Sequence, residues 1–247
     1  MPSHGVIRNS RRRQRSGHTR PVQSAPRPSD RSRMHLVFDA LLIDMDGTLV
    51  DSTARVETVW AHFCREHGLD FDAFIAGSHG RRTMDSVIDA LGDTPSSRRI
   101  ARELEAQETE ATDGIVACTG AAALLAALPA TSWSLVTSAG RDLARRRMQA
   151  AGFDLPAFGV YGEDVAVGKP DPACYRLGAQ RLGVPITACG VLEDAPAGIL
   201  AGVAAGARVL SIGPRFDGQP EVVVNIAGLD ALRVSMIDGK VHVHVDA

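Results

Sequence analysis

The chain has 247 residues, of which 45% are hydrophobic and 4% are aromatic, and its formal net charge is −2. This length suits one large domain, or one domain that carries a smaller insert. No apolar run approaches the roughly 18 residues of a membrane-spanning helix, and no signal-peptide core is visible, so no membrane partner is predicted. The four cysteines are widely spaced without a C-x-x-C motif, which predicts free thiols in a cytoplasmic protein.

The near-neutral total hides an uneven distribution of charge. Residues 1–33 hold nine Arg and one acid, for a net of +8, whereas the rest of the chain has a net of −10. This segment has few apolar residues and four Pro, so we expect a disordered basic tail. It could be an arm that touches nucleic acid or membrane, or a transit peptide, although the prolines argue against the required helix. We favour a third reading, in which translation begins at Met34, because Met34 abuts the first predicted strand.

The first strand is predicted at 37–43 and ends in Asp44-Met45-Asp46-Gly47-Thr48. Ligands of open α/β sheets bind at the C-terminal ends of the strands. One carboxylate of this motif can attack a phosphorus atom while its neighbour moves the proton. The plainer alternative is an acidic turn, because Asp-Gly is a common turn pair.

Residues 52–115 interrupt the strand–helix rhythm with a helical insert, interpreted as a lid over the strand ends. Its first helix shows apolar residues at helical spacing, with Ser52 as the expected N-cap and Gly68 as its end. The apolar positions are Val56, Val59, Trp60 and Phe63. Further helices are predicted at 83–91 and 97–111, and the charges of the latter fit a solvated face.

Strands and helices alternate over the rest of the chain. Strands are predicted at 134–137, 158–161, 189–192 and 208–212, with helices at 119–128, 141–151, 172–182 and 196–206. Such alternation with short links predicts an α/β fold whose parallel sheet is covered by helices on both faces.

The C-terminal stretch differs from this pattern. Residues 233–237 and 241–245 flank Asp238-Gly239-Lys240 and predict a β-hairpin. His242 and His244 lie two residues apart and therefore share a face of the strand. A metal site there is conceivable, but a solvated face is favoured because no third ligand is suggested nearby.

Three more polar motifs follow predicted strands or precede helices. Ser138 closes the strand at 134–137, Lys169 follows Gly168, and Glu193-Asp194 closes the strand at 189–192. Lys169 is one of only two lysines in a chain with 25 arginines. A lysine is a compact point charge that suits a phosphoryl oxygen or a carboxylate nucleophile.

These motifs together fit phosphoryl transfer, which requires charge neutralisation from several sides. Ser138, the N–H of Ala139 and Lys169 can supply it. Asp44 and Asp194 offer hard oxygen ligands that suit Mg²⁺, and Glu193 could tune that shell from behind.

The order of these motifs resembles the haloacid dehalogenase superfamily of phosphohydrolases over about residues 36–226. More narrowly, the chain resembles the sugar- and polyol-phosphate phosphatases, including the 2-deoxyglucose-6-phosphate and glycerol-phosphate phosphatases. The narrower signals lie at 78–83, 193–199 and 205–207. The resemblance implies a Rossmann-like core with a helical cap inserted after the first strand.

The resemblance also implies roles for individual residues. It casts Asp44 as nucleophile, Asp46 as general acid/base, and Ser138 and Lys169 as clamps on the phosphate and the nucleophile. It implies Mg²⁺ bound by Asp44, Asp194 and the backbone carbonyl of Asp46, with Glu193 beside them. The residues assigned to substrate binding are Thr48, Ala139, His79, Arg82 and Asp85. For Arg82, pairing with a lid acid is the alternative.

Two departures from related families bear on the reaction. The founding dehalogenases lack an acid two residues after the nucleophile, so Asp46 disfavours dehalogenation. The β-phosphoglucomutases carry a His where this chain has Val56, and favour Val where it has Thr48. Both differences favour hydrolysis over mutase chemistry.

The sequence therefore predicts a Mg²⁺-dependent phosphatase for small sugar or polyol phosphates, acting as a monomer or weak dimer. The alternatives are a sugar-phosphate mutase and, more distantly, a non-catalytic nucleic-acid-binding protein, which the acidic body disfavours. The expected parts are the tail at 1–33, the catalytic core at 34–51 and 116–226, the cap at 52–115, and a C-terminal hairpin extension at 227–247.

Overall fold

The computed structural model describes Met1 and residues 34–216, 218–220 and 223–245. The tail predicted at 1–33 lies outside the described residues, apart from Met1. In the described part of the chain, no helix combines the length and the apolar character needed to cross a bilayer. All four cysteines are described and are free thiols, as their spacing predicted.

The centre of the fold is a six-stranded sheet with the strand order β6-β5-β2-β7-β8-β9. Every adjacent pair of its strands is parallel, so the predicted α/β class is confirmed. The strands are β2 (Ala40–Ile43), β5 (Trp133–Val136), β6 (Gly159–Val160), β7 (Cys189–Glu193), β8 (Arg208–Ile212) and β9 (Val224–Ile226). The prediction missed β9, because three residues are too few to show a strand pattern.

Helices cover both faces of this sheet, and the side chains of β2 explain why. Leu41 and Ile43 point into the core formed with α5 and α6, whereas Leu42 points into the core formed with α7 and α8. A strand that is buried on both faces reads as a continuous apolar run. The helices of the core are α5 (Ala121–Ala127), α6 (Arg141–Ala150), α7 (Ala173–Leu182) and α8 (Pro196–Ala205).

The single first strand predicted at 37–43 is wrong, because the chain switches sheets at Asp39. Residues Met34–Phe38 form β1, which belongs to a separate antiparallel sheet of order β1-β11-β10. The expected C-terminal hairpin is confirmed as β10 (Leu232–Ile237) and β11 (Lys240–Val245). Strand β1 alternates buried and exposed residues near its end, unlike the fully buried β2, so the two strands occupy different kinds of sheet.

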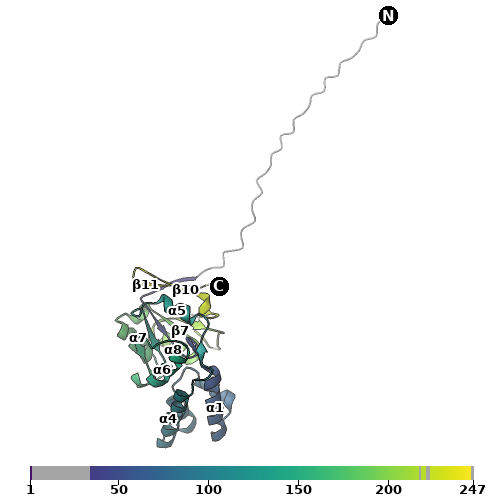
Figure 1. Cartoon of the computed structure of the whole chain (residues 1–247), viewed down its shortest axis with the longest axis vertical. Helices are drawn as coiled ribbons and strands as arrows, with labels where there is room; N and C mark the ends of the chain where they lie inside the picture. The colour runs from purple at the N-terminus through teal and green to yellow at the C-terminus, as the bar shows by residue number, and fades with distance from the viewer. Residues whose placement is uncertain (2–33, 217, 221–222, 246–247) are drawn as a thin grey trace. The chain divides into compact units, whose positions relative to one another are not determined.

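The insert after β2 is a four-helix cap with its own apolar cluster around Trp60 and Phe63. Its helices are α1 (Thr53–His67), α2 (Phe71–Ser78), α3 (Thr83–Leu91) and α4 (Pro95–Glu110), and α2 was not predicted. The chain enters the cap through the short strand β3 (Val50–Asp51) and leaves it through β4 (Val116–Ala117). These two strands pair with each other in antiparallel fashion. Figure 1 shows α1 and α4 at the end of the core opposite to the β10–β11 hairpin.

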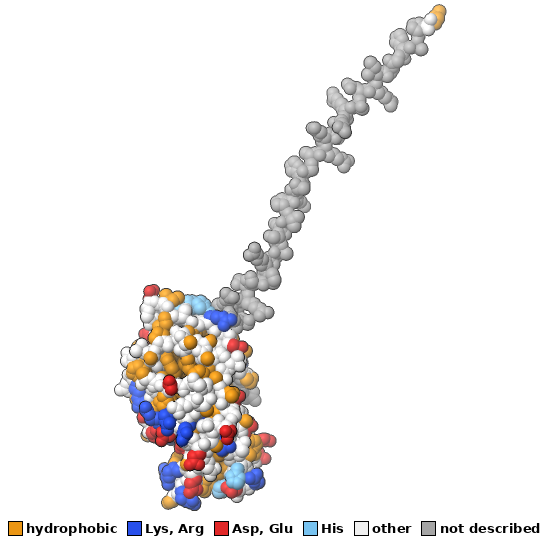
Figure 2. Space-filling view, viewed as in Figure 1, with side chains coloured by type: hydrophobic (Ala, Val, Ile, Leu, Met, Phe, Trp, Pro, Cys, Tyr) orange, Lys and Arg blue, Asp and Glu red, His pale blue; other side chains and the backbone are white. Residues whose placement is uncertain are grey.

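The surface of the cap is rich in charge of both signs (Figure 2). On α4 the exposed pair Arg99–Glu103 is joined at 2.8 Å, in agreement with the predicted solvated face. One acid of the same helix, Glu108, is instead buried against the core. The solvated-face interpretation is therefore correct for one side of α4 and wrong for the side that faces the core.

Candidate active site

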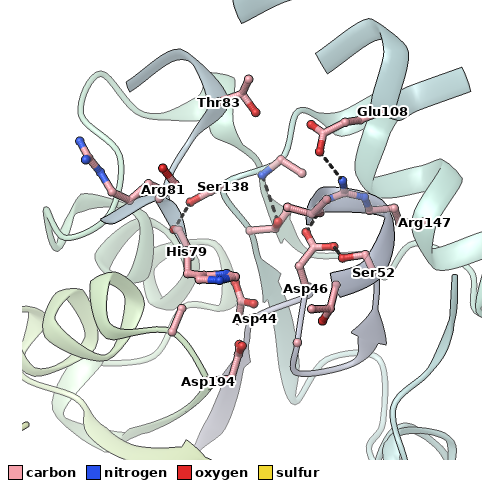
Figure 3. A pocket seen from close by; sticks show the side chains of 18 of the residues that line it. Asp44, Asp46, Ser52, His79, Arg81, Thr83, Glu108, Ser138, Arg147 and Asp194 are labelled. Atoms are coloured by element: carbon pink, nitrogen blue, oxygen red, sulfur yellow. Dashed lines mark hydrogen bonds and ion pairs between the residues drawn. The ribbon is translucent and has the colours of Figure 1, made fainter. Parts of the chain in front are cut away.

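The predicted polar motifs converge at the C-terminal edge of the parallel sheet. Adjacent strands β2 and β7 deliver Asp44 and Asp194, and β5 on the other side of β2 leads into Ser138. The cavity at this edge is closed from the other side by the cap (Figure 3). The parallel register thus assembles residues from distant parts of the chain, as the strand-end positions predicted.

Lys169 is the hub of the site and is fully buried. Its ammonium donates to Asp44 Oδ1 at 2.5 Å, to Glu193 Oε1 at 2.6 Å and to the Val136 carbonyl at 3.2 Å. Its three N–H donors are therefore matched by three acceptors, and the charge lies 5.2 Å from the centre of the Tyr175 ring. The prediction placed Lys169 beside the nucleophile, and the structure brings the two together.

The electrostatics of this pair follow from burial. Burial alone lowers the pKa of Lys169, but the carboxylates of Asp44 and Glu193 outweigh it and hold that pKa well above its usual value. Burial holds the pKa of Asp44 well above its usual value, and Lys169 opposes only part of this rise. The ammonium therefore stays charged, and it favours the ionised form of Asp44 against the effect of burial.

Asp44, Glu193 and Asp194 form an acidic cluster whose ligand atoms lie within 4.8 Å of one another. The buried ammonium of Lys169 pairs with two of these groups, Asp44 and Glu193, so a further cation would balance the negative charge of the cluster when all three carboxyl groups are ionised. Burial, and next Glu193, raises the pKa of Asp194 to about 7. The donor set consists of hard oxygens, and it fits a divalent cation of the Mg²⁺ kind.

Two glycines make room for these carboxylates. A Cβ atom at Gly47 would overlap the Asp194 carboxylate, and the φ of Gly47 is +82°, a conformation that other residues rarely adopt. A Cβ atom at Gly198 would overlap the carboxylate of Glu193. The glycines of both sequence motifs are therefore required by close approach, in addition to the turn chemistry that first drew attention to Gly47.

Glu193 and Thr48 hold their neighbours from behind. Glu193 accepts from Lys169, from the Tyr175 hydroxyl at 3.1 Å and from the Ala195 N–H at 2.8 Å. Thr48 is buried and donates to Asp194 Oδ1 at 3.0 Å. Thr48 was assigned to substrate binding, but its observed contact orients an acid of the cluster.

Asp46 is held by two residues that the sequence did not single out for this task. Ser52 donates to Asp46 Oδ1 at 2.6 Å, and Arg147 of α6 contacts Asp46 Oδ2 at 2.9 Å. Ser52 is the N-cap residue of α1, as predicted, but its hydroxyl makes no capping hydrogen bond. Its side chain serves the acid at the strand end instead.

Arg147 also reaches the cap, where it contacts Glu108 Oε1 of α4 at 3.0 Å. Both side chains are about 95% buried. Burial raises the pKa of Glu108 against the opposing effect of Arg147. For Arg147 burial acts to lower the pKa, but Asp46 and Glu108 raise it above the usual value. The guanidinium thus links Glu108 of the cap to Asp46 at the end of β2 (Figure 3).

The two expected phosphate donors also make contacts within the closed site. Ser138 Oγ donates to the Gly80 carbonyl of the cap at 2.8 Å, and the Ala139 N–H donates to Thr137 Oγ1 at 3.1 Å. Both residues line the cavity. An incoming phosphoryl oxygen would have to exchange with these local acceptors.

The cap residues expected to contact substrate divide into two groups. His79 lines the cavity. Arg82 pairs with Asp85 at 2.7 Å and donates to the core carbonyls of Gly162 and Val165, at 3.2 and 2.9 Å. The alternative reading of Arg82, pairing with a lid acid, is what the structure shows. Arg82 and Asp85 are not among the described residues that line the cavity, whereas Arg81 and Thr83 are.

The cavity encloses about 140 Å³, well below the roughly 300–1,000 Å³ of pockets for drug-sized ligands. Its cap side combines apolar residues of α1 and α2 with polar residues of the α2–α3 link. The lining residues from the cap are Ser52, Thr53, Val56, Trp60, Ile75, Ser78, His79, Gly80, Arg81, Thr83 and Glu108. The arrangement places the Asp44 carboxyl group, a second acid (Asp46) and the acidic cluster around a small polar cavity.

Comparison with known proteins agrees with this geometry. The family model of haloacid dehalogenase-like hydrolases matches residues 38–206. Hexitol phosphatase A of Escherichia coli is 42% identical over 181 residues, which cover 71% of this chain and 83% of that protein. Glycerol-1-phosphate phosphohydrolase 2 of Saccharomyces cerevisiae is 33% identical over 196 residues, which cover 74% of this chain and 78% of that protein.

Among solved structures, a hydrolase from Pseudomonas syringae aligns with a TM-score of 0.68 at 23% identity. The match covers 77% of this chain and 94% of that one. At this identity the likeness concerns the fold. The family model ends at residue 206, so β10 and β11 lie outside the matched segment.

We expect Arg147→Ala to reduce both stability and turnover. The substitution leaves Glu108 buried without its partner, which typically costs about 3–5 kcal/mol in the free energy of unfolding. It also removes one of the two side-chain contacts that hold Asp46. The double variant Arg147→Met/Glu108→Gln removes both buried charges, so it should regain most of the stability measured by denaturant unfolding.

The double variant should nevertheless stay about 100-fold slower than the wild type in phosphate-ester hydrolysis, because Asp46 still lacks the contact with Arg147 and is held by Ser52 alone. Full activity in the double variant would show that Arg147 serves only to pair Glu108.

Proposed function

Because the chain belongs to the haloacid dehalogenase-like hydrolases, we propose that it is a Mg²⁺-dependent phosphatase of small sugar or polyol phosphates. The observation that carries this proposal is the contact between the Asp44 carboxylate and the buried Lys169, beside the acidic cluster and inside a small capped cavity. The names of the similar proteins, a hexitol phosphatase and a glycerol-1-phosphate phosphohydrolase, support the substrate class.

Asp44 attacks the phosphorus atom of the ester in line with the departing oxygen. A P–O bond to the carboxylate forms while the P–O bond to the alcohol breaks, and Asp46 gives its proton to the leaving alkoxide. Asp46 then takes a proton from water, which attacks the aspartyl-phosphate and frees inorganic phosphate and Asp44. Arg147 and Ser52 hold Asp46 for both steps.

Lys169 and Ser138 neutralise the charge of the transferring group, with the Ala139 N–H as a further donor. Mg²⁺ would be held by Asp44, Asp194 and the Asp46 backbone carbonyl, and it supplies positive charge to the phosphoryl oxygens when bound. Glu193 and Thr48 orient these ligands from behind.

Hydrolysis is favoured over a mutase reaction by the wall of the cavity. Val56, at the position where β-phosphoglucomutases carry a His, lines the cavity with an apolar side chain. It has no group that could exchange a proton with a substrate hydroxyl. A cap that closes over the ester keeps bulk water away during the first step. In the second step Asp46 takes a proton from the one water that attacks.

Asp44→Asn should abolish phosphate release while the protein stays folded. The amide is a poor nucleophile, and the loss of such a group typically costs about four or more orders of magnitude in kcat. The assay follows inorganic phosphate from a panel of sugar and polyol phosphates with Mg²⁺. Robust turnover by the variant, or by the wild type in excess EDTA, would overturn the mechanism.

The affinity for Mg²⁺ should rise as the pH is raised through about 7. The pKa of Asp194 is raised to about 7, so below that pH a proton competes with the cation. For each carboxyl proton that Mg²⁺ must displace, its affinity should fall about tenfold for every pH unit below the pKa of that group.

Isothermal titration with Mg²⁺ between about pH 5 and pH 8 measures this dependence, with Asp194→Asn as the comparison. The variant should bind more weakly and with a flatter pH profile. An affinity of the wild type that does not change with pH would contradict the role of Asp194.

His79 and Arg82 should respond differently to substitution. His79 lines the cavity, so His79→Ala should lower kcat/KM for the best polyol phosphate far more than for p-nitrophenyl phosphate, whose leaving group needs little recognition. Arg82 contacts core carbonyls outside the cavity lining, so Arg82→Ala should lower both values by a similar factor. A selective loss of kcat/KM for the polyol phosphate in Arg82→Ala, but not in His79→Ala, would show that Arg82 recognises the substrate. A preference of the wild type for nucleotides would overturn the proposed substrate class.

A further inference from the structure

Three histidines meet on one face of the antiparallel β1-β11-β10 sheet. His242 and His244 share this face of β11, and β1 pairs with β11 so that His35 lies directly opposite His244. Figure 2 shows histidine side chains at the surface of the end of the core where Figure 1 labels β10 and β11. The sequence suggested no third histidine near His242 and His244, because His35 lies 207 residues from His242 along the chain.

The contacts among these side chains are close. His35 Nε2 lies 3.0 Å from His242 Nδ1, a hydrogen bond in which one imidazole donates and the other accepts. The ring of His35 also stacks on that of His244, with centroids 4.2 Å apart and planes 2° from parallel. His35 is exposed and the other two are partly exposed, so solutes can reach the cluster.

We propose that His35 Nε2 and His242 Nδ1 form a binding site for a borderline-soft divalent cation, with Zn²⁺ as the best match. Two imidazole nitrogens that each lie about 2.0–2.1 Å from a tetrahedral zinc ion are about 3.3 Å apart. From the observed 3.0 Å hydrogen bond, the two nitrogens must separate by a few tenths of an ångström and the two rings must turn so that both lone pairs point at the ion; the shared proton leaves when the ion enters. His244 holds the His35 ring by stacking, and water completes the coordination.

The chemistry of this site separates it from the acidic cluster. Imidazole nitrogens favour Zn²⁺, Ni²⁺ and Cu²⁺, whereas Mg²⁺ favours carboxylate and water oxygens. Arg233 lies opposite His244 in the sheet, and Lys240 lies two residues before His242 on the same face, where it pairs with Asp39 at 2.5 Å. The positive charges of Arg233 and Lys240 repel a metal ion that binds through electrostatic attraction alone. The site therefore favours ions that form strong bonds to nitrogen.

The position of the site predicts what the ion does. It links β1 to β11, and β1 leads through Asp39 into β2, whose end carries Asp44. An ion that binds only the folded sheet stabilises it by mass action. The site stands on a different sheet from the proposed catalytic residues, and its existence does not depend on the proposed phosphatase activity.

The test titrates Zn²⁺ into the full-length protein in saturating Mg²⁺, which fills the acidic cluster. His35→Gln and His242→Gln should each weaken the strongest Zn²⁺ binding about tenfold or more. His67→Gln, at an exposed position on α1, is the matched control and should leave it unchanged. Zn²⁺ should also raise the Tm of the wild type and the control, but not that of the other two variants.

A second measurement does not depend on the variants. In ¹⁵N-histidine NMR spectra of the wild type, Zn²⁺ should shift the signals of His35 Nε2 and His242 Nδ1, and Mg²⁺ should not. Equal Zn²⁺ affinity in all variants, or shifts confined to other histidines, would overturn the proposal.

Discussion

The ion-paired Lys169 ammonium, buried between Asp44 and Glu193, is the constraint on which the rest of the site depends. Three carboxylates gather where β2 and β7 end, and their mutual repulsion in a buried setting would be costly without an internal cation. Lysine suits the task because its three donors reach three acceptors from a single point. The negative charge that the ammonium does not balance would attract a metal ion.

The surroundings of this buried ion pair explain several residue choices. Gly47 and Gly198 let two carboxylates pack where a side chain would collide. Tyr175 presents its ring to the ammonium and its hydroxyl to Glu193. The cap adds further contacts to the site. Glu108 pairs with Arg147, which also contacts Asp46, and the Gly80 carbonyl accepts a hydrogen bond from Ser138. Closing the cap therefore changes the contacts of the residues proposed to act on the phosphoryl group.

The sequence predicted the strand-end residues well, because a buried apolar run followed by an acid and a glycine has a strong local signature. It predicted the parallel sheet for the same reason, through alternation of strands and helices. It missed Arg147 and Glu108, which lie on charged helices whose patterns are those of solvated faces, and only tertiary packing shows which charges are buried. Ser52 was assigned to a helix cap, since an N-cap serine and a hydrogen-bond donor to Asp46 are indistinguishable in sequence. The break at Asp39 and the approach of His35 to His242 depend on which strand pairs with β1, and no local pattern reports such pairing.

The central claim is that the phosphoryl group passes through Asp44. The most direct measurement is mass spectrometry of acid-quenched wild-type protein during turnover of a polyol phosphate. The account predicts that the peptide containing Asp44 gains the mass of one phosphoryl group and loses it as the substrate is exhausted. Consumption of the ester with no phosphorylated protein, or with phosphate on another residue, would contradict it.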